Sequence, residues 1–302
     1  MSLETPPLSS QPLDEPEEIT AGSLLERYAA GERDFRGIQL IGADLSQQNL
    51  SGANFRQSNL QNTSFRGATL VGANFREAKL TDVNFEQATL ILANLIGADI
   101  ADGRLARADL SEAGMRSANL VRADLSEATL RETNLSEAVL DHATLQGAVL
   151  SEASLSRGRL LATNLSHANL EHANLTSALM NRAILKNAIL VGTIFTGATL
   201  EGADFQAADL SRAKLNSTNL VNVNLSAANL RGANLSWSSL RGANLRGATL
   251  YRTRLSWSNL SGADLTDAVM INAKLDYTNL RRTDVNGTIM PDGYTMGPKA
   301  EI

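Results

Sequence analysis

The sequence of 302 residues lacks cysteine entirely and contains few aromatic residues. The absence of cysteine excludes disulfide bonds, thiolate metal ligands and cysteine nucleophiles. Aromatic residues make up 4% of the chain and hydrophobic residues 43%, which predicts a core of aliphatic side chains. No apolar run suits a secretory signal at the N-terminus or a membrane-spanning helix elsewhere. These absences favour a cytoplasmic protein that has no membrane partner.

Acidic residues and prolines are both unevenly distributed. Residues 1–20 contain five acidic residues and no basic residue, which leaves 27 acidic and 27 basic residues in the rest. The net charge of −5 therefore belongs to the N-terminal segment. The neutral remainder disfavours nucleic acid as a partner. All six prolines lie outside residues 35–290, which indicates a region held together by backbone hydrogen bonds that proline would remove.

A five-residue period fills this proline-free region. From Phe35 to Met290, every fifth residue is Leu, Phe, Met, Ile or Val, at 52 consecutive positions. After Gln48, the residue two before each of these centres is always small: Ala, Thr, Ser, Gly or Val. A period of five fits neither a helix nor an unbroken strand. It predicts short extended segments whose centre and small residue point inward, separated by turns whose dihedral angles Gly, Asn and Asp tolerate.

Segments such as IGADLSQQNLSGANF, VRADLSEATLRETNL and SGADLTDAVM resemble the A(D/N)LXX pattern of the pentapeptide-repeat family. The resemblance covers about residues 33–290, and the segment before it is similar to that of cyanobacterial members. It implies an all-β fold, a right-handed quadrilateral β-helix with four pentapeptides, or twenty residues, in each coil. The 52 centres would then make about 13 coils and a rod about 60 Å long.

Four segments are expected along the chain. Residues 1–19 are rich in Pro, Glu and Ser and are predicted to be a disordered acidic tail. Residues 20–32 are predicted to hold an N-terminal capping helix. Residues 33–290 are assigned to the β-helix, and residues 291–302 to a closing turn and a C-terminal tail.

The predicted capping helix has recognisable end signals. Ser23 is expected to be its N-cap, Glu26 to complete a capping box, and Gly31 to end the helix. Leu24, Leu25 and Tyr28 share one face and would cover the open end of the first coil.

No residue pattern points to catalysis. The three histidines, His142, His167 and His172, would lie on different faces of the coil, and none is placed to activate a serine. No phosphate-binding loop is present, because Gly-Ala-Asn and Gly-Ala-Asp belong to the repeat. We therefore predict no catalytic residue, no metal site, no cofactor and no enzymatic activity.

Both tryptophans of the chain lie in a Ser-Trp-Ser tripeptide that occurs twice, twenty residues apart. Trp237, Trp257 and Tyr277 should form a column, since twenty residues make one coil. The column is interpreted either as a stabilising aromatic ladder or as a docking patch for a protein partner. The family resemblance adds a third reading, a homodimer formed through the C-terminal coils.

Two charged columns are further candidates. Glu112, Glu132 and Glu152, followed by His172, could form an acidic docking surface or a weak cation site, or simply a solvated face. Arg131 and Arg116 could relieve this acidity. Arg36, Arg56 and Arg76, with Arg116 further along, could meet an acidic partner or the acidic N-terminal segment of the same chain.

An apolar girdle surrounds one coil. Leu179, Ile184, Ile189 and Ile194 occupy four successive positions where Asn or Asp is usual, and Val191 adds to them. If these side chains face outward, they form an exposed patch that could bind a partner. If they turn partly inward, they repack the coil locally.

The function favoured by these features is a noncatalytic scaffold or regulatory adaptor that binds a protein partner through the surface of the rod. The alternative comes from family members that mimic DNA and act on DNA gyrase, in the manner of quinolone-protection proteins. That mechanism requires a strongly acidic rod. The identity of the partner does not follow from the sequence.

Overall fold

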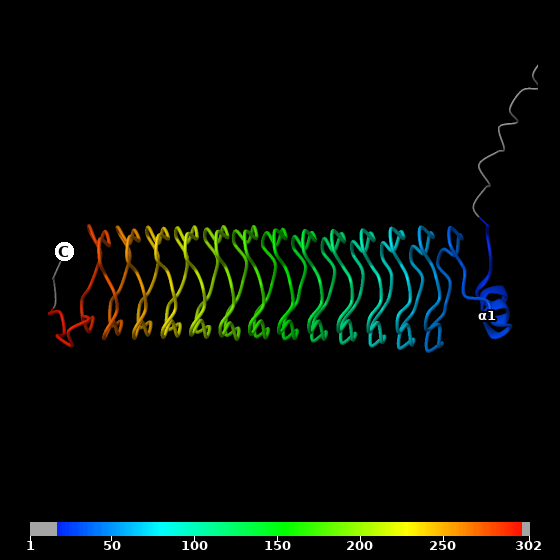
Figure 1. The fold of residues 1–302 in the computed structure, drawn as a ribbon, viewed down its shortest axis with the longest axis horizontal. Helices are drawn as coiled ribbons and strands as arrows, with labels where there is room; N and C mark the ends of the chain where they lie inside the picture. The colour runs from blue at the N-terminus through cyan, green and yellow to red at the C-terminus, as the bar shows by residue number, and fades with distance from the viewer. Residues whose placement is uncertain (1–16, 298–302) are drawn as a thin grey trace, which may run out of the picture.

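The structure is a computed structural model that describes residues 17–297. Its backbone forms a straight rod of stacked coils, with helix α1 (Ala21–Ala29) at the N-terminal end (Figure 1). Isolated parallel β-bridges join residues that lie twenty apart, from Asp34↔Asn54 to Val269↔Ile289. Each coil therefore holds four pentapeptides, as predicted.

The four pentapeptides of each coil form four faces of the rod, named here A, B, C and D. Their first centres are Phe35, Leu40, Leu45 and Leu50, and each face continues at every twentieth residue. A corner takes the names of the two faces that it joins, so that corner AB follows face A and corner DA follows face D. The residue before each centre forms the bridge and lies on the outer side of its face.

Backbone hydrogen bonds connect each coil to the next. The N–H of Leu45 donates to the carbonyl of Ser64 at 2.8 Å, and the N–H of Gln47 donates to the carbonyl of Arg66 at 2.8 Å. The same offset of nineteen residues recurs along the rod. The two donors are the centre and the second of the two turn residues that follow it, called here the first and second turn residues. Proline at the centre or at the second turn residue would therefore remove a bond between coils.

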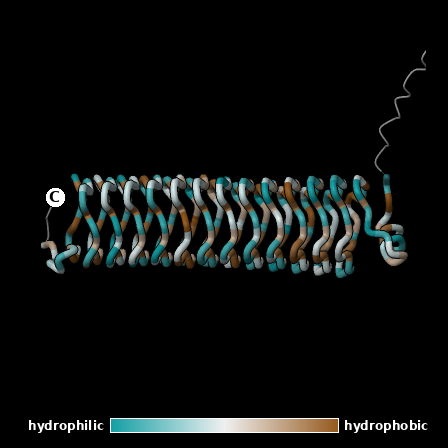
Figure 2. The backbone as a smooth tube through the Cα atoms, viewed as in Figure 1, coloured by the Kyte–Doolittle hydropathy of each residue, from teal (hydrophilic) through white to brown (hydrophobic). Residues whose placement is uncertain are grey.

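The rod is filled by the centres and by the small residues two before them. Leucine predominates among the buried centres, and burial of each such side chain contributes about 1.5–3 kcal/mol. Figure 2 shows apolar residues recurring in every coil. The prediction of a purely aliphatic core is wrong near the N-terminus, where phenylalanines of faces A and C interlock in both stacked and edge-to-face contacts. These phenylalanines are Phe35, Phe55, Phe65, Phe75 and Phe85.

Buried threonines at the small position keep their hydroxyl groups hydrogen-bonded. Thr133 donates to the carbonyl of Leu110 and Thr163 to the carbonyl of Leu140, each at 2.8 Å. Each bond spans 23 residues and thus links neighbouring coils. The small position accepts Thr in place of Ala because this carbonyl lies within reach of the hydroxyl group.

The second turn residue of each pentapeptide has a left-handed backbone conformation. From position 37 to position 287, all of these residues have φ between 53° and 70°. Only 15 of them are glycines, and the other 36 include no Val, Ile or Thr. β-Branched side chains are strongly disfavoured in this conformation, which explains their absence.

Seven Asn or Asp residues occupy the left-handed turn position, as predicted, but Asn and Asp have a second role in the turn. They are most frequent just before the centre, where the backbone is extended, and their side chains cap the turn that follows. Asp44 accepts from the N–H of Ser46 at 2.9 Å, and Asn84 accepts from the N–H of Glu86 at 2.9 Å. Their frequency just before the centre thus reflects side-chain hydrogen bonding.

Helix α1 begins earlier than predicted. Thr20, not Ser23, is the N-cap, because its hydroxyl oxygen accepts from the N–H of Ser23 at 3.2 Å. Leu24 is fully buried, and Leu25 and Tyr28 pack against the same core, so that this face of α1 covers the first coil.

The chain on either side of the coils is also ordered where the structure describes it. Residues 17–19 are not disordered as predicted, because Glu18 forms a parallel bridge with Gln39. The rest of the predicted tail, residues 1–16, lies outside the described residues. At the other end, Ile289 forms an antiparallel bridge with Thr295, which closes a turn after the last coil. Residues 298–302 of the predicted C-terminal tail are also outside the described residues.

Candidate protein-binding surfaces

Corner AB of the last coils carries the predicted aromatic column. The rings of Trp237 and Trp257 are stacked with centroids 4.9 Å apart and an interplanar angle of 1°. Trp257 and Tyr277 are stacked at 4.2 Å and 19°. The three side chains nevertheless remain 62%, 49% and 76% exposed. The residues therefore form a ladder that supports itself and still presents its ring edges to solvent.

The ladder lies on strained backbone. Trp237, Trp257 and Tyr277 occupy the left-handed turn position, with φ of 64°, 63° and 58°. Bulky side chains are rare in this conformation. Glycine fills the same position in many other coils and would relieve the strain.

The serines around the tryptophans shape the turn. Ser238 and Ser258 are buried and donate to the carbonyls of Leu235 and Leu255, three residues earlier. Other hydroxyl residues at the small position reach instead to the preceding coil, as Thr218 does to Phe195. The Ser-Trp-Ser tripeptide thus combines an exposed ring with a buried local hydrogen bond.

A basic strip lies beside the ladder, and the sequence analysis did not find it. Residues 210–263 contain seven Lys or Arg and no Asp or Glu. On face A, Lys214, Arg254 and Lys274 are exposed and form no ion pair within the described residues. The neutral total of the rod conceals this strip, and a count of charges coil by coil would have exposed it.

Corner DA extends the strip around the rod. Tyr251 lies between two guanidinium groups, with the Arg231 and Arg252 carbons 4.9 and 5.0 Å from its ring centroid. Cations over an aromatic face are attracted by its quadrupole, which holds both arginines close to the surface.

The predicted acidic column lies further along the same corner. Glu112, Glu132 and Glu152 are exposed, and their side chains form no ion pair within the part of the chain that the structure describes. The relief of the acidic middle coils expected from Arg131 and Arg116 does not reach these three residues, although Arg116 does relieve Glu137, which belongs to the same acidic region. Arg131 donates to Ser151, and Arg116 pairs with Glu137 of corner AB. His172 follows in the column, as predicted.

Another acidic residue of the middle coils, Glu127 of corner CD, is paired. The Arg107 guanidinium lies 2.8 Å from the Glu127 carboxylate, and its hydrogen bond lowers the pKa of that carboxyl group. Glu112, Glu132 and Glu152 therefore differ from Glu127 in forming no ion pair within the described residues.

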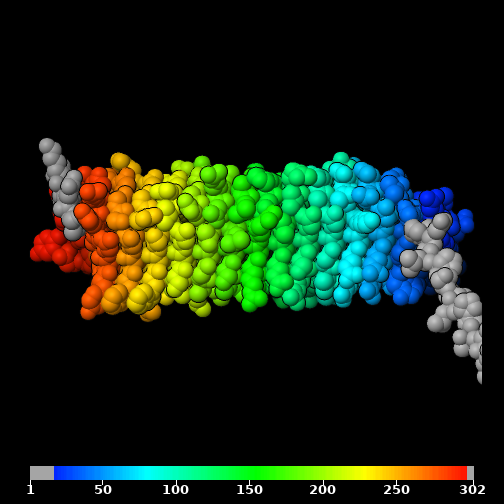
Figure 3. Space-filling view, turned by 90° about the horizontal axis from the view of Figure 1, so that it is seen from above, coloured from blue at the N-terminus to red at the C-terminus, as the bar shows by residue number. Residues whose placement is uncertain are grey.

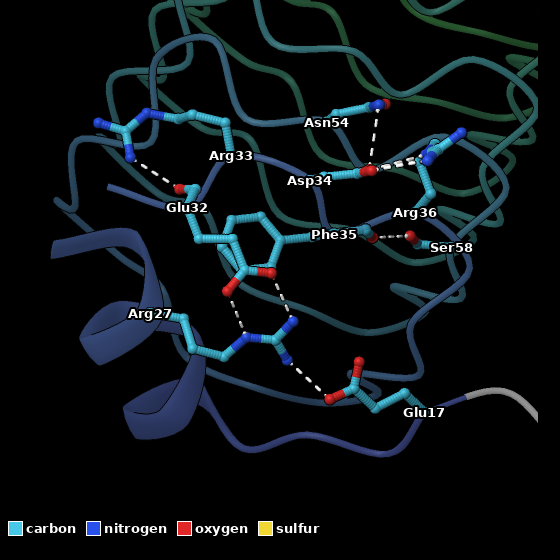
Figure 4. Close-up of polar contacts among 9 residues, drawn as sticks. All are labelled: Glu17, Arg27, Glu32, Arg33, Asp34, Phe35, Arg36, Asn54 and Ser58. Atoms are coloured by element: carbon cyan, nitrogen blue, oxygen red, sulfur yellow. Dashed lines mark hydrogen bonds and ion pairs between the residues drawn. The ribbon is translucent and has the colours of Figure 1, made fainter. Parts of the chain in front are cut away.

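The predicted arginine stripe is occupied by carboxylates of the rod itself. Arg36 binds Asp34 at 2.7 Å, and this hydrogen bond lowers the pKa of Asp34 (Figure 4). Arg76 and Arg56 both approach Glu77, at 3.0 and 3.8 Å.

The predicted pairing of this stripe with the N-terminal segment is not seen in the described residues. Glu17, the first of them, binds Arg27 of α1 at 2.7 Å instead (Figure 4).

The apolar girdle faces outward. Leu179, Ile184 and Ile189 are 45%, 38% and 44% exposed, and Ile194 is half-buried. Each forms a bridge to the coils on both sides, which directs its side chain away from the core. Of the two readings of the sequence, the structure therefore supports the exposed patch and not the inward repacking. Whether a partner binds the girdle stays a prediction.

The rest of the described surface offers no metal cluster and little concavity. Between residues 17 and 297, no group of three or more His, Asp or Glu could hold a metal ion. His142 lines a shallow groove at corner BC, with Leu161, Ala162, Arg182 and Glu201 among its neighbours. Figure 3 shows a rod without deep hollows on the face in view. Among the described residues, no helix has the length and apolarity needed to cross a membrane.

A protein-family model described as "Pentapeptide repeats (8 copies)" matches most of the chain. Its overlapping matches cover residues 38–157, 163–202 and 208–287. No curated protein matches the chain.

Several solved structures are similar. HetL, a pentapeptide repeat protein involved in heterocyst differentiation regulation from the cyanobacterium Nostoc sp. strain PCC 7120, is 30% identical over 92% of this chain and 100% of its own, with a TM-score of 0.32. QnrB1, a plasmid-mediated fluoroquinolone resistance protein, is 21% identical over 73% and 91%, with a TM-score of 0.30. Rfr23 from the cyanobacterium Cyanothece 51142 is 24% identical over 44% and 92%, with a TM-score of 0.20.

Proposed function

Because the chain belongs to the pentapeptide-repeat family, we propose that it is a noncatalytic scaffold or regulatory adaptor that binds a protein partner through its rod surface. Members of this family fold as right-handed quadrilateral β-helices, so the predicted fold class is confirmed. They are typically structural or interaction proteins and not enzymes. The surface of this chain supplies the further argument.

The exposed ladder of Trp237, Trp257 and Tyr277 is the observation that carries the proposal. Rings of this size concentrate binding energy in protein interfaces. Neither indole N–H nor the Tyr277 hydroxyl has a hydrogen-bond partner in the described residues, so three donors remain free. The ladder thus offers large rings and free donors on one exposed surface.

The basic strip on face A indicates the chemistry of the partner. Lys214, Arg254 and Lys274 lie beside the ladder without ion pairs of their own in the described residues. Free indole donors and unpaired cations favour a polypeptide segment that carries carboxylates. The ring faces are largely occupied by one another, which leaves little room for stacked nucleic-acid bases.

Replacement of both tryptophans tests this proposal. The Trp237→Ala/Trp257→Ala variant and the wild type would be used to capture partners from the native cell, and each partner would be identified and its binding then measured with purified protein. We expect the loss of a specific partner while the mass of the rod, measured by light scattering, stays unchanged.

The matched control is Leu92→Ala, which removes another exposed apolar side chain from a left-handed position. It should leave partner binding intact. If the double variant loses self-association instead of a partner, the ladder belongs to a homodimer interface of the C-terminal coils. If neither changes, the ladder is structural and the proposal fails.

A further inference from the structure

The charge along corner DA changes sign at the middle of the rod. The second turn residues of this corner lie in one column, because they are twenty residues apart. Between positions 112 and 252, three of them are glutamates, a histidine and a glycine follow, and two of the last three are arginines. In order they are Glu112, Glu132, Glu152, His172, Gly192, Arg212, Gly232 and Arg252. Arg231, the first turn residue beside Gly232, completes a second set of three charges.

The three glutamates and the arginines of this corner's second set form no ion pair in the described residues, whereas Glu171 beside the column lies 3.8 Å from Nε2 of His172. The guanidinium groups of Arg231 and Arg252 lie close to the ring of Tyr251. When Arg131 and Glu171 are included, the first half of the corner carries −3 and the second half +3. The two halves are therefore equal and opposite.

An apolar surface lies between the two halves. Ile189 and Ile194 flank the corner on faces D and A, and Val191 lies within it. Ile189 and Ile194 replace the usual Asn or Asp, so the turns after them lack the side-chain cap seen elsewhere in the rod. Exposing apolar side chains and losing a side-chain cap do not stabilise the folded chain by itself. Such local losses are expected where a surface meets a partner.

At the centre of corner DA, the ring of His172 lies close to Gly192 of the next coil. A Cβ atom on Gly192 would lie 2.6 Å from Nδ1 of His172, which shows that the imidazole ring lies directly over this glycine. The side chain of His172 is still 62% exposed, so it is available to a neighbouring molecule at the apolar centre.

We propose that two copies of this chain associate side by side and antiparallel along corner DA. A two-fold axis between His172 and Gly192 places Glu112 opposite Arg252 and Glu152 opposite Arg212. Glu132 then lies opposite Gly232 and beside Arg231, and the same axis places Arg131 opposite Arg231. The apolar residues meet close to the axis, with charged pairs on both sides of them, as in many protein interfaces.

A second copy fits this corner better than another occupant. An acidic partner would satisfy only the arginines, and a basic partner only the glutamates. A parallel, staggered neighbour would pair one set of charges in each rod and leave the other set free to bind a further rod. The antiparallel pair brings Glu112, Glu132 and Glu152 of each copy near an arginine of the other and closes. This inference does not rest on the proposed function, because the aromatic ladder lies at a different corner.

The mass of the full chain in solution is the first test. The paired region spans seven coil spacings, or about 34 Å, and its charged ends are open to solvent. We expect a mass of twice 32.2 kDa at low ionic strength and a shift towards the single chain as salt is added. A single chain at low ionic strength and high protein concentration would overturn the proposal.

Charge reversal gives a sharper test. One variant carries Glu112→Arg, Glu132→Arg and Glu152→Arg, and the other carries Arg212→Glu, Arg231→Glu and Arg252→Glu. The backbone tolerates such changes, because Arg and Glu occupy left-handed positions elsewhere, as Arg122 and Glu127 do. Each variant alone should be a single chain, and an equimolar mixture should restore the double mass.

The control reverses three arginines at corner BC: Arg241→Glu, Arg281→Glu and Arg282→Glu. It should associate like the wild type. The proposal fails if either variant of corner DA keeps the double mass alone, or if the mixture does not restore it. Loss of association in the control would also contradict it.

Single labels determine the orientation of the two rods. The chain has no cysteine, so Gln57→Cys and Ser177→Cys each introduce one labelling site in the same column of corner AB. In the antiparallel pair, the two Gln57 copies are offset by roughly 60 Å along the rod and the two Ser177 copies by only ~2 Å. Spin-label distances should therefore be much longer at Gln57. Equal distances at both sites would show a parallel pair, and long distances at both would show an end-to-end dimer.

Discussion

At the scale of single residues, position within the pentapeptide decides which side chains are allowed. The left-handed second turn residue accepts Gly, Glu, Arg and even Trp but no β-branched residue. The residue before the centre favours Asn and Asp because their side chains cap the turn, as Asp44 does for Ser46. Departures from these preferences identify the ladder and the girdle as surfaces of interest.

Two adjacent alanines allow a direct test of these positional preferences. Ala227 has φ of 55° and Ala228 is 1% exposed. Ala227→Gly should raise the free energy of unfolding by about 0.5–1 kcal/mol, because glycine carries no left-handed penalty. Ala228→Gly should lower it by about 1 kcal/mol through loss of packing and higher backbone entropy. Denaturant unfolding of both variants measures the difference, and a change of the same sign in both would contradict the assignment of positions.

At the scale of elements, the capping helix is held to the rod by packing and by an ion-paired cluster. Leu24 of α1 is fully buried against the first coil. The Arg27 guanidinium binds Glu32 at 2.6 Å and Glu17 at 2.7 Å (Figure 4). The cluster thus joins three successive segments of the chain: the strand-like segment before the helix, the helix itself and the start of the first coil.

This cluster makes the docking of α1 sensitive to acid. The hydrogen bond from Arg27 lowers the pKa of Glu32 below its usual range. A carboxyl group with a lower pKa in the folded state stabilises that state above its unfolded pKa and loses this contribution as the pH falls through the folded value. We expect the backbone amide chemical shifts of α1 to change between about pH 5 and pH 3 as docking weakens.

Two variants separate this effect from general acid unfolding. Glu32→Gln should remove the acid-dependent change in α1, because the residue can no longer titrate. Glu26→Gln is the control, since Glu26 has no ion pair in the described residues, and it should behave like the wild type. An unaltered acid response in Glu32→Gln would contradict the assignment.

At the scale of the whole molecule, the middle coils have a negative net charge and the later coils a positive one. Residues 100–204 carry three more acidic than basic residues, whereas residues 210–263 carry seven basic residues and no acidic one. A rod that imitates duplex DNA needs negative charge along its surface. This division argues against the gyrase-directed alternative and in favour of separate surfaces for separate contacts.

A supercoiling assay tests that alternative. We expect no inhibition of DNA gyrase by this protein, even at concentrations well above that of the enzyme, because the C-terminal coils repel the positively charged DNA-binding surface that a mimic must occupy. Inhibition would support DNA mimicry. In that case Glu112→Gln, Glu132→Gln and Glu152→Gln should weaken it if the unpaired acidic column were responsible.

The repeat, the length of the coil and the aromatic column could be predicted from the order of residues along the chain. These features depend on contacts that recur at fixed offsets, so the 20-residue spacing of Trp237 and Trp257 was sufficient to predict their stacking. The N-cap was mistaken because Thr20 and Ser23 are both good capping residues, and only the backbone at the start of α1 distinguishes them.

The partners of the outward-facing side chains could not be predicted and follow from the folded rod. The structure showed that Ile189 faces solvent, that Arg36 is bound to Asp34, and that Glu112 and Arg252 share a corner without ion pairs of their own in the described residues. The reason is physical. The side chain of a buried centre can pack only inside its coil, at a position that the repeat fixes. An exposed side chain can instead contact a residue of its own turn, of the next coil or of another molecule.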